Sequence, residues 1–271
     1  MLTKEEKIEI VNLSLRDMID PRPYSQIIND DCFVRIITKT DYSFFRNSVY
    51  WSVLDDDDID EKIEKIIADY KEHDLSFRWV VGPGSEPKEL VDMLVFHGFQ
   101  KVPNGFPGAG MIGTYHSMNI QSTVPFQGEY EMQIVAGSDQ IDSFVGIMET
   151  CFRYTVDNEK FLKIAIHDDV FAQPRRLWYF LVCYRHEPIG ILGARIYDDG
   201  FAYLSAGAVL PEYRRKGALK YLAKNVIGFL KDMGINTYTT QTLPHTSENL
   251  CANFGFETVC QVDTLLYLLD S

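Results

Sequence analysis

A short basic turn between a hydrophobic strand and a long amphipathic helix carries the clearest chemical signal in the sequence. The stretch VLPEYRRKGALKYL spans residues 209–222 and places Arg214, Arg215 and Lys216 directly before Gly217. The first backbone N–H groups of a helix have no partner within it and lie at its positive end. Because Gly217 has no side chain, a ligand can approach the main chain closely. We therefore predict an anion site here, for a phosphate or a diphosphate.

The pattern of this turn differs from two common phosphate motifs and resembles a third. It is neither a GxxxxGK[ST] P-loop nor the GxGxxG of dinucleotide-binding folds. It resembles the signature of the GNAT superfamily of acyl-CoA-dependent N-acyltransferases, [RQ]-x-x-G-x-[GA], which follows a strand that ends in V-x-P. Val209-Leu210-Pro211 matches that strand end, and residues 214–217 match the first four signature positions. Leu219 departs from the pattern, because Gly or Ala is usual at its position.

The resemblance covers residues 128–271 and implies how acetyl-CoA, the co-substrate, would be held. Its diphosphate would lie on the amides from Arg215 to Leu219, and its pantetheine arm along the splayed strand edge near Ala208–Leu210. The N–H of Val209 or Leu210 would polarise the thioester carbonyl. A neutral amine would then attack directly, without a covalent enzyme intermediate. The implied cofactor-binding residues are Ala208, Val209, Leu210, Arg214, Arg215, Lys216, Gly217, Ala218 and Leu219.

The acid and base of such a reaction are less clear from the residues. The family's usual acid is a Tyr four residues before the glycine of a Gly-Phe pair, and that position is Cys251 here. Its thiol could protonate a leaving CoA thiolate, or it could be a small buried residue on a helix. Glu149 is our candidate base. The alternatives are Tyr203 and the Asp198-Asp199 pair, although Asp198-Asp199-Gly200 is also typical of a tight turn.

Alternating and helical hydrophobic patterns predict the elements that position these residues. Leu219, Leu222, Ala223, Val226, Ile227 and Leu230 recur at helical spacing after the turn, and Gly234 follows as a cap. The strands predicted over 177–185 and 189–197 are joined by the short turn His186-Glu187-Pro188 and should form a hairpin. The other predicted elements of this part are strands over 130–135, 201–210 and 237–241, helices over 139–152, 158–166 and 247–254, and a final strand over 257–268.

We predict that the first part of the chain is a degenerate unit related to the second part. PKELVDMLVFHGFQKV (residues 87–102) aligns without gaps with PHTSENLCANFGFETV (residues 244–259), at an offset of 157 residues. This weak repeat predicts two diverged copies of one unit, with chance similarity as the alternative. Gly82 and Gly84 superficially suggest anion binding, but their place in the repeat favours a structural role. The acidic run 55–58 indicates either a helix start or a divalent-metal site. Further predicted elements are helices over 4–17 and from 59, and strands over 32–38 and 48–54.

Composition limits the remaining possibilities. The chain has 271 residues, a net charge of −13 and a pI near 4.9, which argues against a general nucleic-acid binder. We found neither a membrane-spanning apolar run nor an export signal, and the five cysteines have no metal-ligand spacing, so we expect a cytoplasmic protein without metal. We predict an α/β (α+β) protein of two GNAT-like domains, residues 1–125 and 126–271, each a mixed, mostly antiparallel sheet flanked by helices.

The expected activity is transfer of an acetyl group to an amine of a small molecule or peptide. A net-negative cleft would attract ammonium groups, and we expect no membrane or nucleic-acid partner and a monomer or homodimer. The alternative is a non-catalytic acyl-CoA-binding or interaction protein, which Leu219 and Cys251 suggest.

Overall fold

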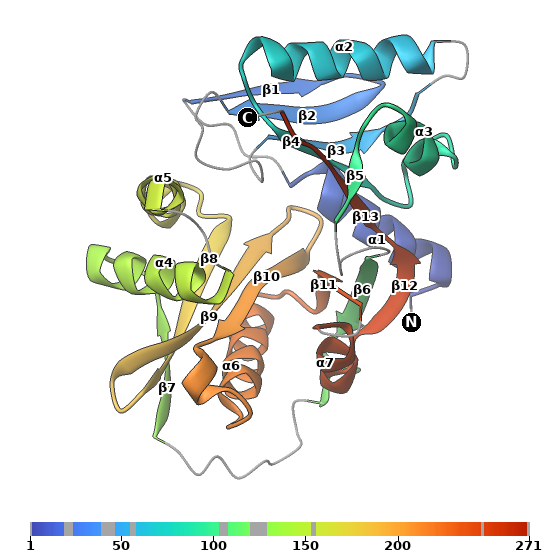
Figure 1. Ribbon diagram of the computed structural model, residues 1–271. Coiled ribbons are helices and arrows are strands. Elements are labelled where there is room, and N and C mark those ends of the chain that lie inside the picture. Colours follow the sequence, from blue (N-terminus) through green and yellow to red (C-terminus); the bar gives the residue numbers. More distant parts are fainter. Residues whose placement is uncertain are drawn as a thin grey trace. The chain divides into compact units, whose positions relative to one another are not determined.

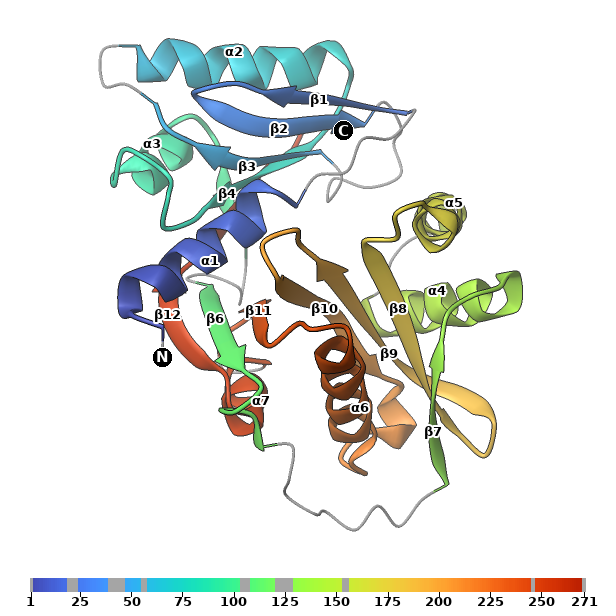
Figure 2. The ribbon, with the colours of Figure 1, turned by 180° about the vertical axis from the view of Figure 1, so that it is seen from behind.

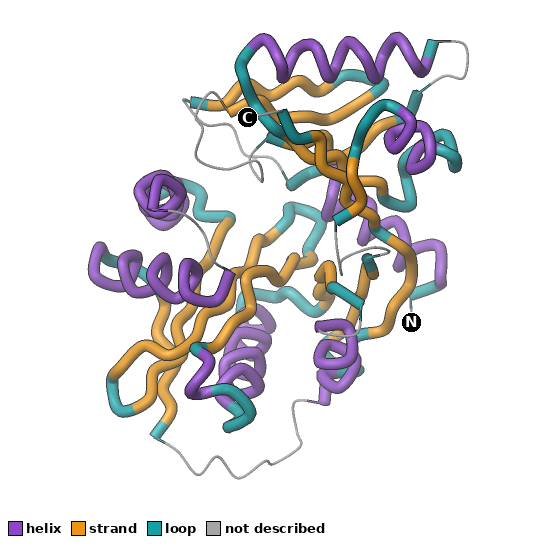
Figure 3. The backbone as a smooth tube through the Cα atoms, viewed as in Figure 1, coloured by secondary structure: helices purple, strands orange, loops and turns teal. Residues whose placement is uncertain are grey.

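The computed structural model describes residues 2–18, 24–38, 47–54, 58–102, 108–119, 129–152, 156–244 and 247–269, and the rest is grey in Figure 3. Contacts divide the chain into two compact units. The first contains residues 1–112, 241–252 and 257–271, and the second contains residues 113–240 and 253–256. The proposed domain division at residue 125 is a boundary along the sequence and stays a prediction.

The first unit contains a six-stranded sheet with the order β1-β2-β3-β4-β13-β5 (Figure 1). Only β3 and β4 pair in parallel. The strands are β1 (Ser25–Asn29), β2 (Phe33–Thr38), β3 (Ser48–Ser52), β4 (Phe77–Val81), β5 (Gln100–Lys101) and β13 (Asp263–Tyr267). The sequence patterns did not predict β1, which has only partly buried or exposed residues and forms the edge of the sheet.

Three helices cover this sheet: α1 (Lys4–Arg16), α2 (Ile59–Glu72) and α3 (Leu90–Phe96). The predicted apolar face of α2 is confirmed, because Ile59, Ile63, Ile66, Ile67 and Tyr70 are all buried. They pack with α3 on one face of the sheet, and α1 packs with β2, β3 and β4 in a second cluster. Asp58 precedes α2 and pairs with Lys62 Nζ at 2.8 Å, which fits a helix start. Residues 55–57 of the acidic run lie outside the described residues.

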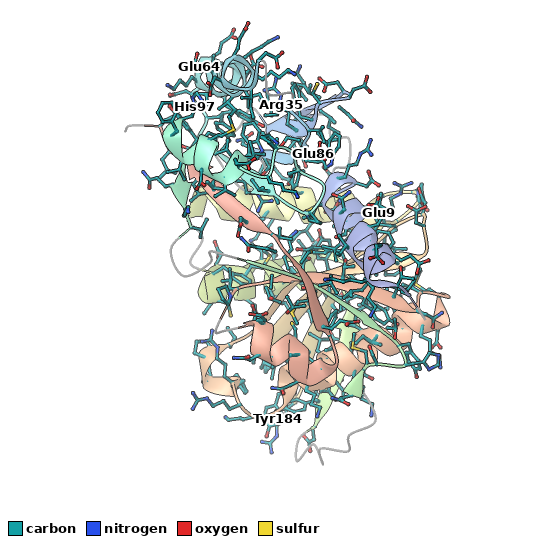
Figure 4. The ribbon with its side chains drawn as sticks, turned by 90° about the vertical axis from the view of Figure 1, so that its right-hand side faces the viewer. Glu9, Arg35, Glu64, Glu86, His97 and Tyr184 are labelled. Carbon is teal, nitrogen blue, oxygen red and sulfur yellow. The ribbon has the colours of Figure 1, made fainter. Side chains whose placement is uncertain are left out.

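A partly buried ion pair joins α2 to β2. The Arg35 side chain, which Figure 4 labels near α2, is 5% exposed and donates through Nη2 to Asp69. Its guanidinium also lies 5.1 Å from the ring centroid of Phe33. The hydroxyl of Tyr70 donates to the carbonyl of Ile36 at 2.7 Å, so α2 is fixed to the sheet by polar as well as apolar contacts.

The seven-stranded sheet has the order β12-β6-β11-β10-β9-β8-β7. Its strands are β6 (Ala109–Thr114), β7 (Tyr130–Ile134), β8 (Leu177–Tyr184), β9 (Glu187–Ile196), β10 (Phe201–Val209), β11 (Thr237–Thr242) and β12 (Glu257–Gln261). The predicted β8–β9 hairpin and the turn at Asp198–Gly200 are confirmed, since both connections join antiparallel neighbours. The strands β10 and β11 pair in parallel.

Helices lie on both faces of the β7–β10 part of this sheet. They are α4 (Ser138–Phe152), α5 (Val156–Phe171) and α6 (Ala218–Asp232). Tyr179, Leu181 and Cys183 of β8 face α4 and α5. Phe180 and Trp178 point the other way and contact Phe229 of α6, at centroid distances of 5.3 and 5.1 Å. Figure 2, viewed from behind Figure 1, shows α6 in front of the strands.

The two copies of the repeat share their local structure. The helix α3 (Leu90–Phe96) corresponds to α7 (Ser247–Phe254), because an offset of 157 carries Leu90 onto Ser247. Each helix ends in a left-handed glycine, Gly98 with φ 91° and Gly255 with φ 99°. A Cβ on Gly255 would lie 2.2 Å from the carbonyl oxygen of Ser117. The Gly-Phe pairs are therefore turns that only glycine fits, followed by a buried phenylalanine.

The predicted final strand over 257–268 is wrong, because the chain changes sheets within it. β12 ends at Gln261 in the seven-stranded sheet, and β13 begins at Asp263 in the six-stranded sheet. The first copy crosses in the opposite direction, from β5 to β6. The two crossing segments bond to each other, since Val262 N–H donates to Gly108 O, and Gly108 N–H to Asp263 Oδ1, both at 3.1 Å. Each half of the sequence thus supplies a strand to the other sheet.

Candidate functional site

A β-bulge interrupts β10 before the basic turn. Ser205 pairs with Gly193 and Ala208 with Ile191, so two residues of β10 face one residue of β9. The first of these two, Ala206, is left-handed with φ 53°, which is uncommon for a residue other than glycine. Ser205 and Gly207 are exposed, although β10 lies inside the sheet. The bulge therefore opens the middle of a central strand to solvent.

Beyond the bulge, one edge of β10 leaves its neighbour. The parallel pairing with β11 runs only from Phe201 to Tyr203, whereas β10 continues to Val209. Leu210 N–H donates to Ile189 O at 2.9 Å, toward β9. Because successive residues of a strand bond to alternate edges, the N–H of Val209 points to the other edge, where the pairing with β11 has ended. Of the two N–H groups predicted to polarise a thioester, that of Leu210 is already engaged, and the geometry favours Val209.

The basic turn places an uncapped helix start beside this edge. A 3₁₀ turn over Pro211–Tyr213 leads into it. Gly217 is the N-cap of α6, with φ 87° and ψ −1°, and it supplies no side-chain cap. The N–H of Tyr221, in the first turn of α6, donates to Gly217 O at 2.9 Å. The N–H groups of Ala218 and Leu219 lie in the first turn, before that bond, where backbone donors have no acceptor within the helix.

The charges around this start favour an anion. The first turn of α6 contains no acidic residue, and Arg214, Arg215 and Lys216 are exposed just before it. Helix α1 has the opposite arrangement: Thr3 and Glu6 form a capping box that uses its first donors. The positive end of α6, with these cations beside it, therefore has the electrostatics of an anion-binding helix start.

Several contacts hold the turn in shape. Arg214 Nε donates to Val209 O at 2.9 Å, so this side chain supports the strand end. Arg215 is left-handed with φ 62°. The hydroxyl of Tyr130, from β7, donates to Lys216 O at 3.1 Å. Sequence reasoning missed Tyr130, because it lies 86 residues from the turn and belongs to no motif.

Leu219, the departure from the family signature, packs toward β10. Its Cδ1 lies 3.8 Å from the position of a Cβ on Gly207, and the side chain is half-buried. The larger side chain at this position therefore meets a glycine on the facing strand.

The two predicted catalytic residues lie on different helices. Glu149 is half-buried near the end of α4. Cys251 is half-buried on α7, and burial raises the pKa of its thiol to about 11. Such a thiol stays protonated at neutral pH. It is a weaker acid than an ordinary alkyl thiol, whose pKa is about 8.5.

The alternative bases, Asp198, Asp199 and Tyr203, lie at different distances along β10 from the basic turn. Asp198 is exposed and pairs with Arg176 at 2.6 Å. The Asp198–Gly200 turn precedes β10, and the basic turn follows it, so the strand separates the two by about 26 Å at roughly 3.3 Å per residue. These aspartates therefore belong to a hairpin. Tyr203 is half-buried on β10, two residues before the exposed Ser205.

Other candidate motifs have structural explanations. A Cβ on Gly82 would lie 2.6 Å from Leu15 Cδ1, and one on Gly84 would lie 2.3 Å from Asn12 Oδ1. These glycines let α1 approach β4, as the repeat had indicated. Among the described residues, no three His, Cys, Asp or Glu side chains gather as metal ligands. None of the helices in the described ranges is long and apolar enough to cross a membrane.

The family model for the acetyltransferase (GNAT) family matches residues 141–256, which include the bulged strand, the turn and α6. No curated protein matches the chain by sequence.

Several solved structures share the fold over nearly the whole chain. One is a GCN5-related N-acetyltransferase from Kribbella flavida, at 14% identity, covering 97% of this chain and 96% of that one, with a TM-score of 0.70. A conserved protein from Staphylococcus epidermidis, titled functionally unknown, has 12% identity, coverages of 95% and 98%, and a TM-score of 0.68.

A tandem GNAT protein from the clavulanic acid biosynthesis pathway has 12% identity, covers 95% of this chain and 87% of that one, and has a TM-score of 0.59. At these identities the likeness shows the fold. The family model identifies an acetyltransferase (GNAT) domain at residues 141–256, and the chain as a whole shares the fold of these GNAT structures.

Proposed function

We propose that the protein transfers an acetyl group from acetyl-CoA to an amine of a small molecule or peptide. The observation that carries this proposal is the start of α6, where the backbone N–H groups of Ala218 and Leu219 follow Gly217, three exposed cations precede it, and no side chain of the N-cap residue caps the helix. A diphosphate fits this donor set, because both the helix dipole and the N–H groups favour negative charge. The family match makes coenzyme A the expected carrier of that diphosphate.

The reaction follows from how the thioester would lie on β10. With the diphosphate on residues 215–219, the pantetheine arm runs along the open edge at Ala208–Leu210. The Val209 N–H then donates to the thioester oxygen and stabilises the negative charge that develops there. The amine nitrogen attacks the carbonyl carbon, the C–S bond breaks, and CoA leaves as a thiolate. Two protons move: one leaves the amine, and one goes to the thiolate.

Glu149 and Cys251 are our candidates for these proton transfers. A carboxylate at Glu149 would accept a proton from the amine. Donation from a thiol with a pKa of about 11 to a thiolate with a pKa near 8.5 is uphill by roughly 2.5 pK units. Cys251 would therefore assist weakly, and water can supply the same proton, since thiolates are good leaving groups.

The experiment is a CoA-release assay with acetyl-CoA and a panel of primary amines, including polyamines, aminosugars and peptides with a free N-terminus. Amine-dependent release supports the proposal. Tight binding of acetyl-CoA without release on any amine would instead support a non-catalytic acyl-CoA-binding protein. Leu219 at the signature position and Cys251 in place of the usual Tyr favour that second function. Absence of binding would refute both.

A further inference from the structure

Tyr130 reaches the basic turn from a distant part of the sheet. It is the first residue of β7, the edge strand, and its hydroxyl donates to the carbonyl of Lys216 at 3.1 Å. Its ring lies between two other tyrosines, with centroids 5.7 Å from those of Tyr184 and Tyr221. Figure 4 labels Tyr184, which pairs with Tyr130 across the β7–β8 ladder. These rings fix where the hydroxyl of Tyr130 can point.

The bond to Lys216 has a consequence for the next N–H group. In a trans peptide the carbonyl and the N–H point in opposite directions. The Lys216–Gly217 peptide has its carbonyl directed at Tyr130, so the N–H of Gly217 must point away from Tyr130. The contact on one side of the turn therefore sets which group the turn presents on its other side.

A turn of this shape has an alternative state. The φ and ψ of Gly217, 87° and −1°, are close to the values that the third residue of a β-turn has in one of the two orientations of the peptide before it. Type I and type II turns differ in the orientation of the central peptide, which is Lys216–Gly217 here. Rotating that peptide would present the carbonyl of Lys216, with its partial negative charge, where the N–H of Gly217 now lies.

We propose that Tyr130 is a positioning residue that holds the Lys216–Gly217 peptide in the orientation that binds the diphosphate of the acyl donor. This inference rests on the proposed function. The phenol can act as the donor throughout the neutral range, because burial and the nearby Tyr184 raise the pKa of Tyr130. Tyr130 would not touch the reacting atoms, so its effect should appear in donor binding and not in the chemical step.

The test is Tyr130→Phe, which removes only the hydroxyl. Tyr184→Phe is the matched control, because it makes the same change in the neighbouring ring. Two donors are compared with the same amine: acetyl-CoA, and acetylpantetheine, which lacks the diphosphate. For acetyl-CoA, Tyr130→Phe should raise KM and the Kd measured by calorimetry by about 3- to 10-fold, the size of one lost hydrogen bond, with kcat unchanged. For acetylpantetheine, kcat/KM should stay within about twofold, and Tyr184→Phe should bind acetyl-CoA like the wild type.

The donor comparison separates positioning from a general structural role. If Tyr130→Phe loses the same factor with both donors, or binds acetyl-CoA as tightly as the wild type, the inference is overturned while the proposed function stands. If the wild type itself does not bind acetyl-CoA, the proposed function fails and the inference fails with it.

Discussion

Replacing Gly217 tests the placement of the diphosphate most directly. The residue has φ 87° at the N-terminus of α6, and Gly217→Glu would put a carboxylate where the anion is expected. A unit charge about 4 Å from another costs about 1 kcal/mol in water and about 4 kcal/mol at an effective dielectric constant of 20. A diphosphate with two charges doubles these values. Acetyl-CoA should therefore bind at least tenfold more weakly, as measured by calorimetry.

Two controls separate charge from backbone strain. Any side chain at a left-handed residue costs about 1 kcal/mol in stability. Gly217→Gln has that strain and nearly the same volume without the charge. Gly234→Glu has the charge and the same φ of 87°, but it lies past the opposite end of α6, where a Cβ meets nothing within 4 Å. Binding by Gly217→Glu that equals binding by Gly217→Gln would refute the placement of the anion at this turn.

Three further substitutions test other parts of the structure. Tyr179→Phe removes a 2.6 Å hydrogen bond to the buried carboxylate of Asp169. It should lower the free energy of unfolding, measured with urea, by about 1.5–3 kcal/mol. An unchanged free energy of unfolding would contradict this. Burial raises the pKa of Asp263, so this carboxyl holds its proton more tightly in the folded than in the unfolded protein. The free energy of unfolding of the wild type, relative to that of Asp263→Asn, should therefore fall as the pH rises from about 4 through the raised pKa. A difference in free energy that stays constant from about pH 4 to 7 would contradict this. Cys251→Ala should lower kcat by less than tenfold, because a thiol of pKa about 11 is a poor donor, whereas a loss of a hundredfold or more would make it the principal acid.

Much of the site could be predicted from the sequence because its signals are local. The strand, the basic turn, Gly217 and the amphipathic helix are contiguous, so their chemistry follows from spacing alone. The same holds for the Gly-Phe pairs, whose left-handed glycines end α3 and α7. Local patterns also gave the β8–β9 hairpin, where alternation and a short turn coincide.

The features that sequence reasoning missed depend on contacts between distant residues. Residues 257–268 look like one continuous strand in the sequence, and the change of sheet at Val262 appears only in the structure, where β12 has no buried residue and β13 buries Asp263 and Leu265. The contact from Tyr130 to Lys216 depends on how β7 lies against the turn, which no spacing encodes. The edge strand β1 has too few buried residues to produce a clear pattern.

Under the proposed placement of the acyl donor, the bulge in β10 accounts for the exposed strand edge beside the basic turn. In a regular ladder, the strand after Tyr203 would stay bonded to β11, and its backbone donors would be used. The extra residue at Ala206–Gly207 shifts the register against β9, and the pairing with β11 ends before it. The open edge then leads from the exposed Gly207 past Val209 toward the uncapped start of α6. An extended acyl carrier with an anionic end would need both the open strand edge and the uncapped helix start, one after the other along its length. The left-handed conformation of Ala206, costly for a residue with a side chain, is consistent with a backbone shaped by binding.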